Sequence, residues 1–365
     1  MRKFFTASLI LALTFLSSMS AFAQLSVPEG SQRAKVMQRV GITDITIDYG
    51  RPRVNKREIW GRLVPYGFNN LGFGTSTAAP WRAGANNNTI IEFSHDVKVE
   101  GKKIAAGKYG LHMALEESGA VTVIFSNDYN AWGSYFYDEK NDALRVNVQS
   151  KETAHTELLT FEFATVTANS ATASLRWEKK EIPFQIEVDV NGIVMDQIKS
   201  DFNNQPGFTQ ANWDQAAGFA MGAGELDQAL EWVNGSIAGN FFSQSTFNNL
   251  SMKSQILTQM GKKEEAAGMV DQIVELGNPT QLYQYGGQFI ASEQHDLAVK
   301  VAKANVKKSD GAWPSNYGLA RAYSAVGNYK SAIKSLKAAQ GKAPERFQQR
   351  LAGNLEQLQK GEDIN

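Results

Sequence analysis

The sequence predicts two domains, an antiparallel β-sandwich or barrel-like domain followed by an α-helical solenoid built from repeats. In the first half, apolar and polar residues alternate with a period of two, which is typical of strands with one buried face. In the second half, the apolar residues take a helical spacing, in units that recur about every 34 residues. No alternating strand–helix pattern occurs in the first half, so a doubly wound fold is not expected.

The N-terminus predicts export. Residues 1–23 read as a signal peptide: Arg2 and Lys3 precede the apolar run 4–16, and the small residues of 21–23 form a cleavage site after Ala23. We therefore expect a periplasmic or secreted protein. No later stretch approaches the roughly 18 apolar residues of a membrane span, so no transmembrane anchor is expected after cleavage.

The composition argues against several classes of function. The 37 basic and 37 acidic residues give a net charge of zero, so nucleic acid is not an expected partner. The sequence has no cysteine, and its four histidines show no metal-binding spacing, so neither a metal nor another cofactor is expected. Nucleophile-elbow and complete dinucleotide-loop motifs are absent, which favours a protein that is not an enzyme.

The β-sandwich domain is expected over residues 24–191, with about nine or ten strands. Turn residues separate the strand patterns, and the clearest patterns lie at 45–49, 109–115, 121–125, 144–148, 159–163, 173–177 and 182–188. Strict alternation predicts one dry and one wet face for each strand. On the strand at 109–115 it places His112 opposite the core face.

The segment Tyr49–Asn86 is the predicted recognition loop. It is rich in glycine, aromatic residues and arginine, and compact domains rarely keep about 35 irregular residues unless these are functional or packed by their own side chains. Together with the aromatic segment Asn130–Tyr137, it has the composition of a face that binds a glycan, a peptide or a small polar ligand. The candidate ligand-binding residues are Arg51, Arg57, Trp60, Trp81, Arg82, Asn86, His112, Trp132, Tyr135 and Tyr137. The alternative is that these residues fill the open end of the core.

Several motifs of the first half resemble those of the family called domain of unknown function 2911, including DYGRPRV, REIWGRLVPYG, PWRAGAN, KVEGKKIAAGKYGLHM and VIFSNDYNAWGSYFYDEKNDALRV. The resemblance covers about Ser31 to Val190. It implies a secreted β domain with no settled activity, of a kind found in exported proteins of Bacteroidetes-type bacteria. Many members read GANE where this sequence has Asn87 in the last position, so a carboxylate of the family pattern is missing here.

The segment Tyr317–Pro344 resembles a tetratricopeptide repeat, with small residues where two helices would touch and Gly327 at the turn. Earlier units align on one alanine of the second helix, which recurs as Ala229, Ala266, Ala298 and Ala332. The steps of 37, 32 and 34 residues between them bracket the period of that family. The repeats are expected over 207–365 with a final capping helix, after a linker helix at 192–206.

The repeat arm is expected to bind a protein or peptide partner in its groove, with Tyr283, Gln284, Asn316 and Tyr317 as candidate lining residues. The sequence as a whole favours an exported, non-catalytic binding protein of the periplasm or cell envelope. Two alternatives stay open. One is a hydrolase that acts on a glycan or peptide, with its site under the loop at 49–86, and the other is a structural adaptor in an envelope complex.

Overall fold

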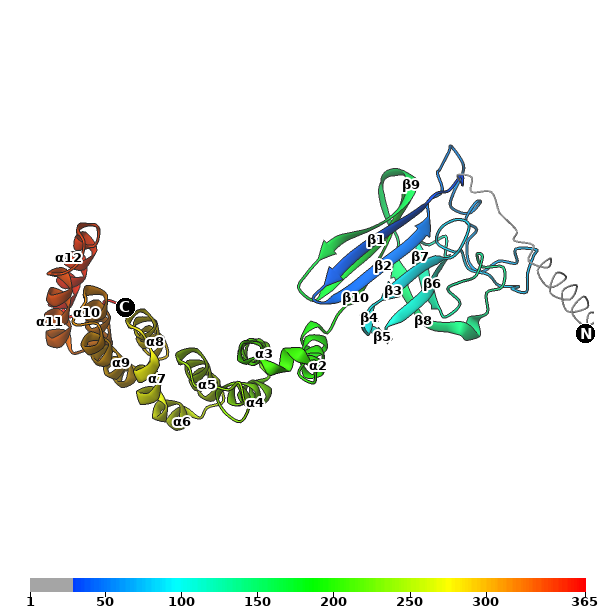
Figure 1. Cartoon of the computed structure of the whole chain (residues 1–365). Helices are drawn as coiled ribbons and strands as arrows, with labels where there is room; N and C mark the ends of the chain where they lie inside the picture. Colours follow the sequence, from blue (N-terminus) through cyan, green and yellow to red (C-terminus); the bar gives the residue numbers. More distant parts are fainter. Residues whose placement is uncertain (1–28) are drawn as a thin grey trace, which may run out of the picture. The chain divides into compact units, whose positions relative to one another are not determined.

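The computed structural model describes residues 29–365, so the predicted signal peptide at 1–23 lies outside the described residues. The chain divides into two compact units, with the boundary between Val194 and Met195. The first unit consists of antiparallel sheets and the second of helices (Figure 1), which confirms the predicted fold class.

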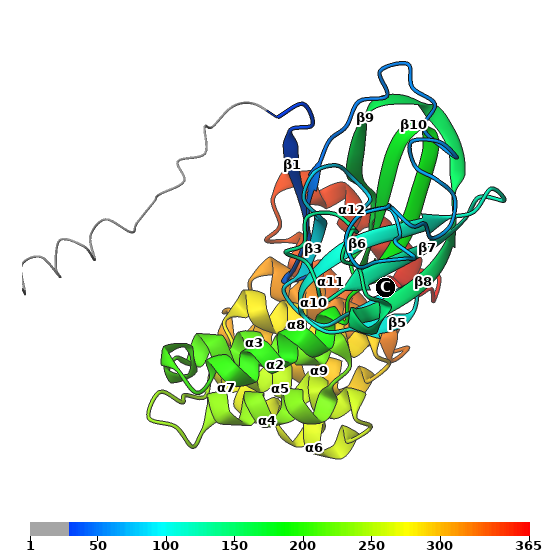
Figure 2. The same ribbon diagram turned by 90° about the vertical axis from the view of Figure 1, so that its right-hand side faces the viewer.

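The β unit contains ten strands within the described residues, arranged in two antiparallel sheets. The six-stranded sheet has the order β1-β2-β3-β6-β7-β8, from β1 (Arg33–Val40), β2 (Thr43–Gly50), β3 (Thr89–Phe93), β6 (Gly107–Leu115), β7 (Ala120–Ser126) and β8 (Asp142–Gln149). The four-stranded sheet has the order β5-β4-β10-β9, from β4 (Val97–Val99), β5 (Lys102–Ile104), β9 (Lys151–Val166) and β10 (Ser170–Glu187). Figure 2 shows the long strands β9 and β10 in one layer and β6, β7 and β8 in the other.

The core of the β unit lies between the two sheets. Strand β2 follows the predicted alternation, because Ile45 and Ile47 are fully buried while Thr46 and Asp48 are only partly covered. The largest fully buried side chains come from both sheets and are Trp177, Phe93, Phe125 and Phe184. Each such side chain contributes about 1.5–3 kcal/mol through the removal of apolar surface from water.

Strand β6 departs from the predicted alternation. Leu111 and Met113 face the core as expected, but Gly110, His112 and Ala114 on the opposite face are buried as well. The prediction of a wet face is therefore wrong for this strand. Alternation in the sequence indicates which side chains of a strand point to the same face. It does not indicate whether another segment covers that face, and here irregular segments outside β6 cover it.

The loop at 49–86 bridges the two sheets. Near its start, Pro52 O accepts a hydrogen bond from Leu159 N of β9. Near its end, Trp81 and Met113 of β6 exchange both backbone hydrogen bonds, at 2.8 and 2.9 Å. Between these points the loop contributes the buried residues Val54, Ile59 and Val64 to the core, and Ala83 follows just after Trp81. Part of the loop therefore fills the core, in line with the alternative stated above for the aromatic and arginine residues.

The second unit contains ten helices from α3 onward. They are α3 (Gln210–Ala223), α4 (Leu226–Ile237), α5 (Phe247–Gln259), α6 (Lys263–Gly268), α7 (Val270–Leu276), α8 (Pro279–Ala291), α9 (His295–Lys308), α10 (Trp313–Ala325), α11 (Tyr329–Gln340) and α12 (Glu345–Gln359). The helix α2 (Val190–Asp201) spans the boundary between the units, and its residues Met195 and Ile198 pack in the first core of the helical unit.

The four aligned alanines mark the second helix of successive pairs. Ala229 lies on α4, Ala266 on α6, Ala298 on α9 and Ala332 on α11, and each is at most 1% exposed. A methyl side chain at this position lets the two helices of a pair approach closely. Within this unit, the first helices α3, α5, α8 and α10 line the inner side of the helical array (Figure 1).

Candidate functional site

Exposed aromatic rings gather on two irregular segments of the β unit, the loop at 49–86 and the connection between β7 and β8. Phe73 is 64% exposed, Trp132 57% and Phe136 51%, which is unusual for such large apolar side chains. We call the following set the aromatic face: Phe68, Phe73, Arg82, Trp132, Tyr135, Phe136 and Arg145.

Arg82 is held at the centre of the aromatic face. Its Nη1 donates a hydrogen bond of 2.6 Å to Asn86 O. Its Cζ lies 5.5 Å from the ring centroid of Trp132 and 5.3 Å from that of Tyr135, and these two rings stack at 5.6 Å. The guanidinium occupies the place where a Cβ at Gly133 would point, 2.4 Å away from Cζ. A guanidinium within about 6 Å of a ring centroid is attracted by the ring face, so Arg82, Trp132 and Tyr135 hold one another in place.

The two segments of the aromatic face pack directly on each other. The ring of Phe73 lies edge-on to Tyr135 at 5.5 Å and to Phe136 at 6.0 Å. Ser76 N donates a hydrogen bond of 2.9 Å to Tyr135 O. A Cβ at Gly74 would lie 2.2 Å from the same carbonyl oxygen, so only glycine allows this close approach. The face is therefore one continuous surface.

A buried histidine–serine pair lies on the outer side of the six-stranded sheet. His112 Nδ1 lies 3.0 Å from Ser134 Oγ, and both residues are 2% exposed. Burial, with a smaller contribution from the charge of Arg82, lowers the pKa of His112 to about 4, so the imidazole is neutral at neutral pH. A hydroxyl beside a neutral imidazole is a nucleophile–base geometry. Among residues 29–365, however, no carboxylate hydrogen-bonds to this imidazole, so the third member of a triad is missing.

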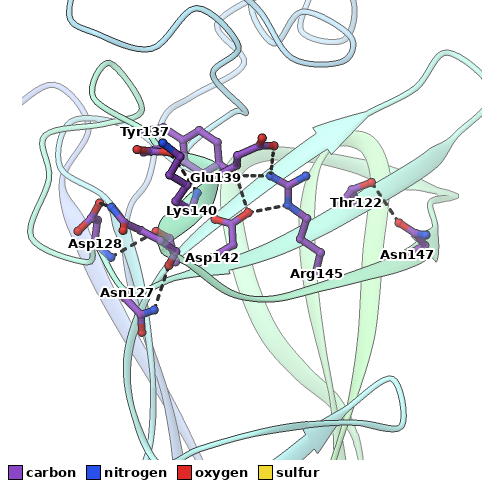
Figure 3. A network of polar contacts seen from close by, with 12 residues as sticks. Thr122, Asn127, Asp128, Tyr137, Glu139, Lys140, Asp142, Arg145 and Asn147 are labelled. Atoms are coloured by element: carbon purple, nitrogen blue, oxygen red, sulfur yellow. Dashed lines mark hydrogen bonds and ion pairs between the residues drawn. The ribbon is translucent and has the colours of Figure 1, made fainter.

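A second polar cluster connects the aromatic face to β8 (Figure 3). Tyr137 Oη donates to Asp142 Oδ2 at 2.6 Å, and Arg145 donates to that carboxylate through Nε at 2.5 Å and to Tyr137 Oη through Nη2 at 2.8 Å. Burial raises the pKa of the Asp142 carboxyl despite these hydrogen bonds. The Arg145 guanidinium also covers the ring of Phe68, with 5.5 Å between Cζ and the centroid.

A β-bulge brings this cluster together. Residues three apart on a regular strand point to opposite faces, so the sequence spacing does not place Asp142 beside Arg145. In β8, however, Leu144 pairs with Phe125 while Asp142 pairs with Ser126, which leaves Ala143 as an extra residue. The extra residue turns both side chains to one face. Sequence reasoning missed this pair because only the bulge reveals it.

The structure brings six of the ten predicted ligand-binding residues to this region. Arg82, Trp132 and Tyr135 belong to the aromatic face, and Asn86 supports it through its carbonyl oxygen. The remaining two residues are His112 and Tyr137, which lie next to the aromatic face. The ring of His112 is buried, and its centroid is 5.5 Å from that of the Tyr137 ring.

The other four predicted residues lie elsewhere in the β unit. Arg51 donates to Leu159 O and to Thr160 Oγ1, and the Arg57 side chain donates to backbone carbonyls of its own loop. Trp60 and Trp81 pack with one another and with the buried core residue Trp177. These side chains anchor the loop, which connects β2 to β3 and whose backbone hydrogen-bonds to β9 near its start and to β6 near its end.

In the helical unit, a groove of about 340 Å³ opens between α5 and α8. Its lining residues carry no formal charge, and they are Ser254, Gln255, Thr258, Gln259, Tyr285, Gln288, Phe289, Ser292 and Gln294. Gln255 Nε2 donates to Gln288 Oε1 at 3.0 Å across the groove. The volume falls in the range of roughly 300–1,000 Å³ that is typical of ligand sites.

None of the four predicted groove residues lines this groove: Tyr283 and Gln284 lie elsewhere on α8, and Asn316 and Tyr317 lie on α10. Their exposure differs. Tyr317 is buried, and its hydroxyl accepts hydrogen bonds from Arg350 and Asn354. Asn316 is also buried and donates to Gly311 O. The ring of Tyr283 is half-buried against the last core of the unit, and only Gln284 is exposed.

Two kinds of feature are absent from the part of the chain that the structure describes. Residues 29–365 contain no group of three or more histidine and carboxylate side chains that could hold a metal ion. No helix among them is long and apolar enough to cross a membrane.

Comparison with known proteins identifies a family for the first part of the chain. Residues 31–186 match the model of the family described as "Protein of unknown function (DUF2911)". The β unit carries a DUF2911 domain. This confirms the predicted resemblance of the first half. A search of the curated proteins found no match.

Solved structures resemble the helical part, downstream of the DUF2911 domain. The C-terminal part of a tetratricopeptide-repeat protein from Cytophaga hutchinsonii is 13% identical, with a TM-score of 0.36, over 47% of this chain and 67% of that one. A tetratricopeptide repeat protein from Parabacteroides merdae is 15% identical, with a TM-score of 0.34, over 47% and 67%. YrrB, described as a repeat protein with an unusual peptide-binding site, is 14% identical, with a TM-score of 0.31, over 45% and 84%.

Proposed function

We propose that this protein is an exported, non-catalytic binding protein of the periplasm or cell envelope, and that its helical unit binds a peptide segment of a partner protein. The groove between α5 and α8 carries this proposal. Export rests on the signal-peptide pattern of residues 1–23. The DUF2911 domain would present the aromatic face as a second binding surface.

The chemistry of the groove suits an extended peptide. Each glutamine side chain offers both a donor and an acceptor, which matches the alternating N–H and C=O groups of a peptide backbone. Gln255 and Gln288 come from facing helices and already hydrogen-bond to each other across the groove. The rings of Tyr285 and Phe289 also line the groove, where only 3% and 5% of their surfaces are exposed. The absence of charged lining residues predicts binding that depends little on salt.

The aromatic face favours a glycan or another small polar ligand as the second binding function. Sugar rings and other planar groups stack on exposed aromatic side chains, and a guanidinium beside them donates hydrogen bonds. The exposed ring of Trp132, stacked on Tyr135 and next to Arg82, provides this combination.

The hydrolase alternative depends on His112 and Ser134. Both side chains are almost completely buried, and no orienting carboxylate contacts the imidazole among the described residues. The observations therefore favour binding over catalysis.

Selection of peptides tests the proposal. A phage library of random ten-residue peptides is panned on the chain from Gln24 to Asn365, and selected peptides are then titrated by fluorescence anisotropy. We expect Gln255→Ala combined with Gln288→Ala to weaken binding at least tenfold. Gln284→Ala, on α8 but outside the groove lining, is the matched control and should leave affinity within twofold. If no peptide is enriched, or the selected peptides bind the double variant as tightly, the structural-adaptor alternative replaces this proposal.

A further inference from the structure

The end of the described chain folds back onto α10. After α12, Gly361 adopts a φ of +78° and turns the chain. The following residues then contact the first helix of the last repeat pair. Ser324 Oγ donates to Asp363 Oδ1, and Ile364 N donates to Ser324 Oγ at 3.1 Å. Figure 1 places the C-terminal end on the inner side of the helical unit, close to α10.

Asn365 makes a reciprocal contact with one arginine of α10. Arg321 Nε donates to Asn365 Oδ1 at 3.1 Å, and Asn365 Nδ2 donates to Arg321 O at 3.0 Å. The amide therefore satisfies a side-chain donor and a backbone carbonyl together. Both groups lie one helical turn from Ser324, so the two polar contacts are on the same stripe of α10.

The residue between these two contacts packs inward. Ile364 packs against the last core cluster of the helical unit, which contains Tyr317 and Leu358. Asp363 and Asn365 thus make polar contacts and Ile364 between them makes an apolar contact. Successive side chains of an extended peptide point in opposite directions in the same way. Burial alone would raise the pKa of Asp363, but hydrogen bonds from Ser324 and from the Asn365 side chain outweigh it and lower the pKa. The bound carboxyl is therefore ionised at neutral pH.

We propose that Arg321, Ser324 and the part of the last core cluster that Ile364 contacts form a second peptide-binding site, the α10 site, for extended segments with the order acidic, aliphatic, amide. The tail Gly361–Asn365 is its resident ligand, and a partner segment of the same chemistry binds by displacing it. This site is separate from the groove of the proposed function, because it uses α10 and a charged side chain instead of the glutamines of α5 and α8.

Two features make the tail a displaceable ligand. It contains no helix or strand, so its release breaks only its contacts with α10 and the adjacent core. The turn at Gly361 joins it directly to α12, so it competes at a local concentration on the order of millimolar. A free peptide must therefore bind the chain with its tail much more weakly than a chain without it.

A labelled tail peptide tests the inference. The probe is fluorescein-labelled Gly-Glu-Asp-Ile-Asn with an amidated end, and a scrambled peptide is its control. It is titrated by fluorescence anisotropy into the chain from Gln24 to Asn365 and into a shorter chain that ends at Lys360. We expect at least tenfold tighter binding to the shorter chain. We also expect Ser324→Ala and Arg321→Ala to weaken that binding at least fivefold, while Arg346→Ala, a change of an arginine on α12, leaves it within twofold.

A second variant guards against misfolding of the shorter chain. Ile364→Asp in the full-length chain removes the apolar contact of the tail and should expose the α10 site without shortening the protein. The inference is overturned if the probe binds neither the shorter chain nor Ile364→Asp, or if it binds them no better than the unmodified chain. Peptides selected through Gln255 and Gln288 would still bind in that case, so the two proposals fail separately.

Discussion

His112 Nδ1 lies 3.0 Å from Ser134 Oγ, in a contact that is buried on the side of β6 expected to face water. Ser134 comes from the connection between β7 and β8, which covers this side of the sheet. The pKa of His112 therefore depends on whether the β7–β8 connection covers the imidazole. Because the cover removes the imidazole from water, the charged form of His112 is disfavoured as long as the cover stays closed.

Acid should destabilise the DUF2911 domain through His112. Its pKa is about 4 in the folded protein, against an ordinary value of about 6.5, so the unfolded chain binds the proton more readily between these two pH values. The free energy of unfolding should be constant above about pH 6.5 and should fall by up to about 3 kcal/mol towards pH 4. Urea unfolding at four pH values between 4.5 and 7.5 measures this dependence.

Two variants separate the contribution of His112 from that of other groups. His112→Gln keeps a hydrogen-bonding side chain without a titrating ring, so the fall in stability below pH 6.5 should become shallower. His155→Gln, which changes a half-exposed histidine, is the control. An unchanged slope in His112→Gln would show that the buried imidazole does not carry the pH dependence.

The close packing of the aromatic face depends on Gly74. Gly72 and Gly74 have similar φ values of +72° and +81°, but only Gly74 has a backbone atom in the place of a Cβ, Tyr135 O at 2.2 Å. We expect Gly72→Ala to cost about 1 kcal/mol of backbone strain, and Gly74→Ala to cost about 2–4 kcal/mol. Thermal or urea unfolding compares the two, and equal costs would mean that the two segments are not in contact.

The first part of the loop at 49–86 should behave as core. Ile59 is 2% exposed within the main cluster, whereas Leu63 is 44% exposed four residues later. Ile59→Ala should therefore lower the free energy of unfolding by about 2–4 kcal/mol. Leu63→Ala should change it by no more than about 0.5 kcal/mol. A similar small effect for both variants would contradict the filler role.

The aligned alanines should not tolerate larger side chains. Ala332 is fully buried between helices of its repeat, while Ala338 on the same helix is exposed. Ala332→Leu should destabilise the helical unit by about 1–3 kcal/mol because it forces α10 and α11 apart. Ala338→Leu adds the same side chain to the surface and should be nearly neutral. The helical circular dichroism signal during urea unfolding measures the stability of the helical unit. An Ala332→Leu variant as stable as the unmodified protein would argue against the repeat alignment.

A ligand of the aromatic face should stabilise the protein. We expect at least one compound in a thermal-shift screen of oligosaccharides, peptides and divalent metals to raise the melting temperature of the mature chain. Arg82→Ala and Trp132→Ala should each abolish that shift, because they remove the cation and the exposed ring that lie 5.5 Å apart. Arg57→Ala, which changes an exposed arginine away from the face, is the control. A shift that survives both face variants places the ligand elsewhere.

Local patterns predicted the fold well where one segment decides its own structure. The alternation at Ile45 and Ile47 identified a strand and its buried face. The recurrence from Ala229 to Ala332 identified the helix pairs, because every repeat needs a small residue at the same contact. The resemblance to the DUF2911 family identified the whole β unit, since its motifs are distinctive over a long stretch.

The candidate sites were predicted less completely, because they depend on contacts between distant segments. Trp60 and Trp81 have the composition of ligand-binding residues, yet they pack against Trp177, about 100 positions further on. Asp142 and Arg145 share a face only through the extra residue of a bulge. The contacts of Asp363 and Asn365 with α10 follow from the path of the chain after α12, which no periodicity encodes.

The amino-acid sequence alone determined the order of a β domain and a helical repeat domain, the faces of regular strands and the spacing of the repeats. These properties depend on neighbours within a turn of helix or a few residues of strand, so periodicity records them. The tertiary structure decided that part of the long loop is core, that Arg82 of this loop packs against Trp132 of the β7–β8 connection, and that the tail contacts α10. Those outcomes depend on which surfaces meet after the chain has folded, because burial is a property of the whole packed domain.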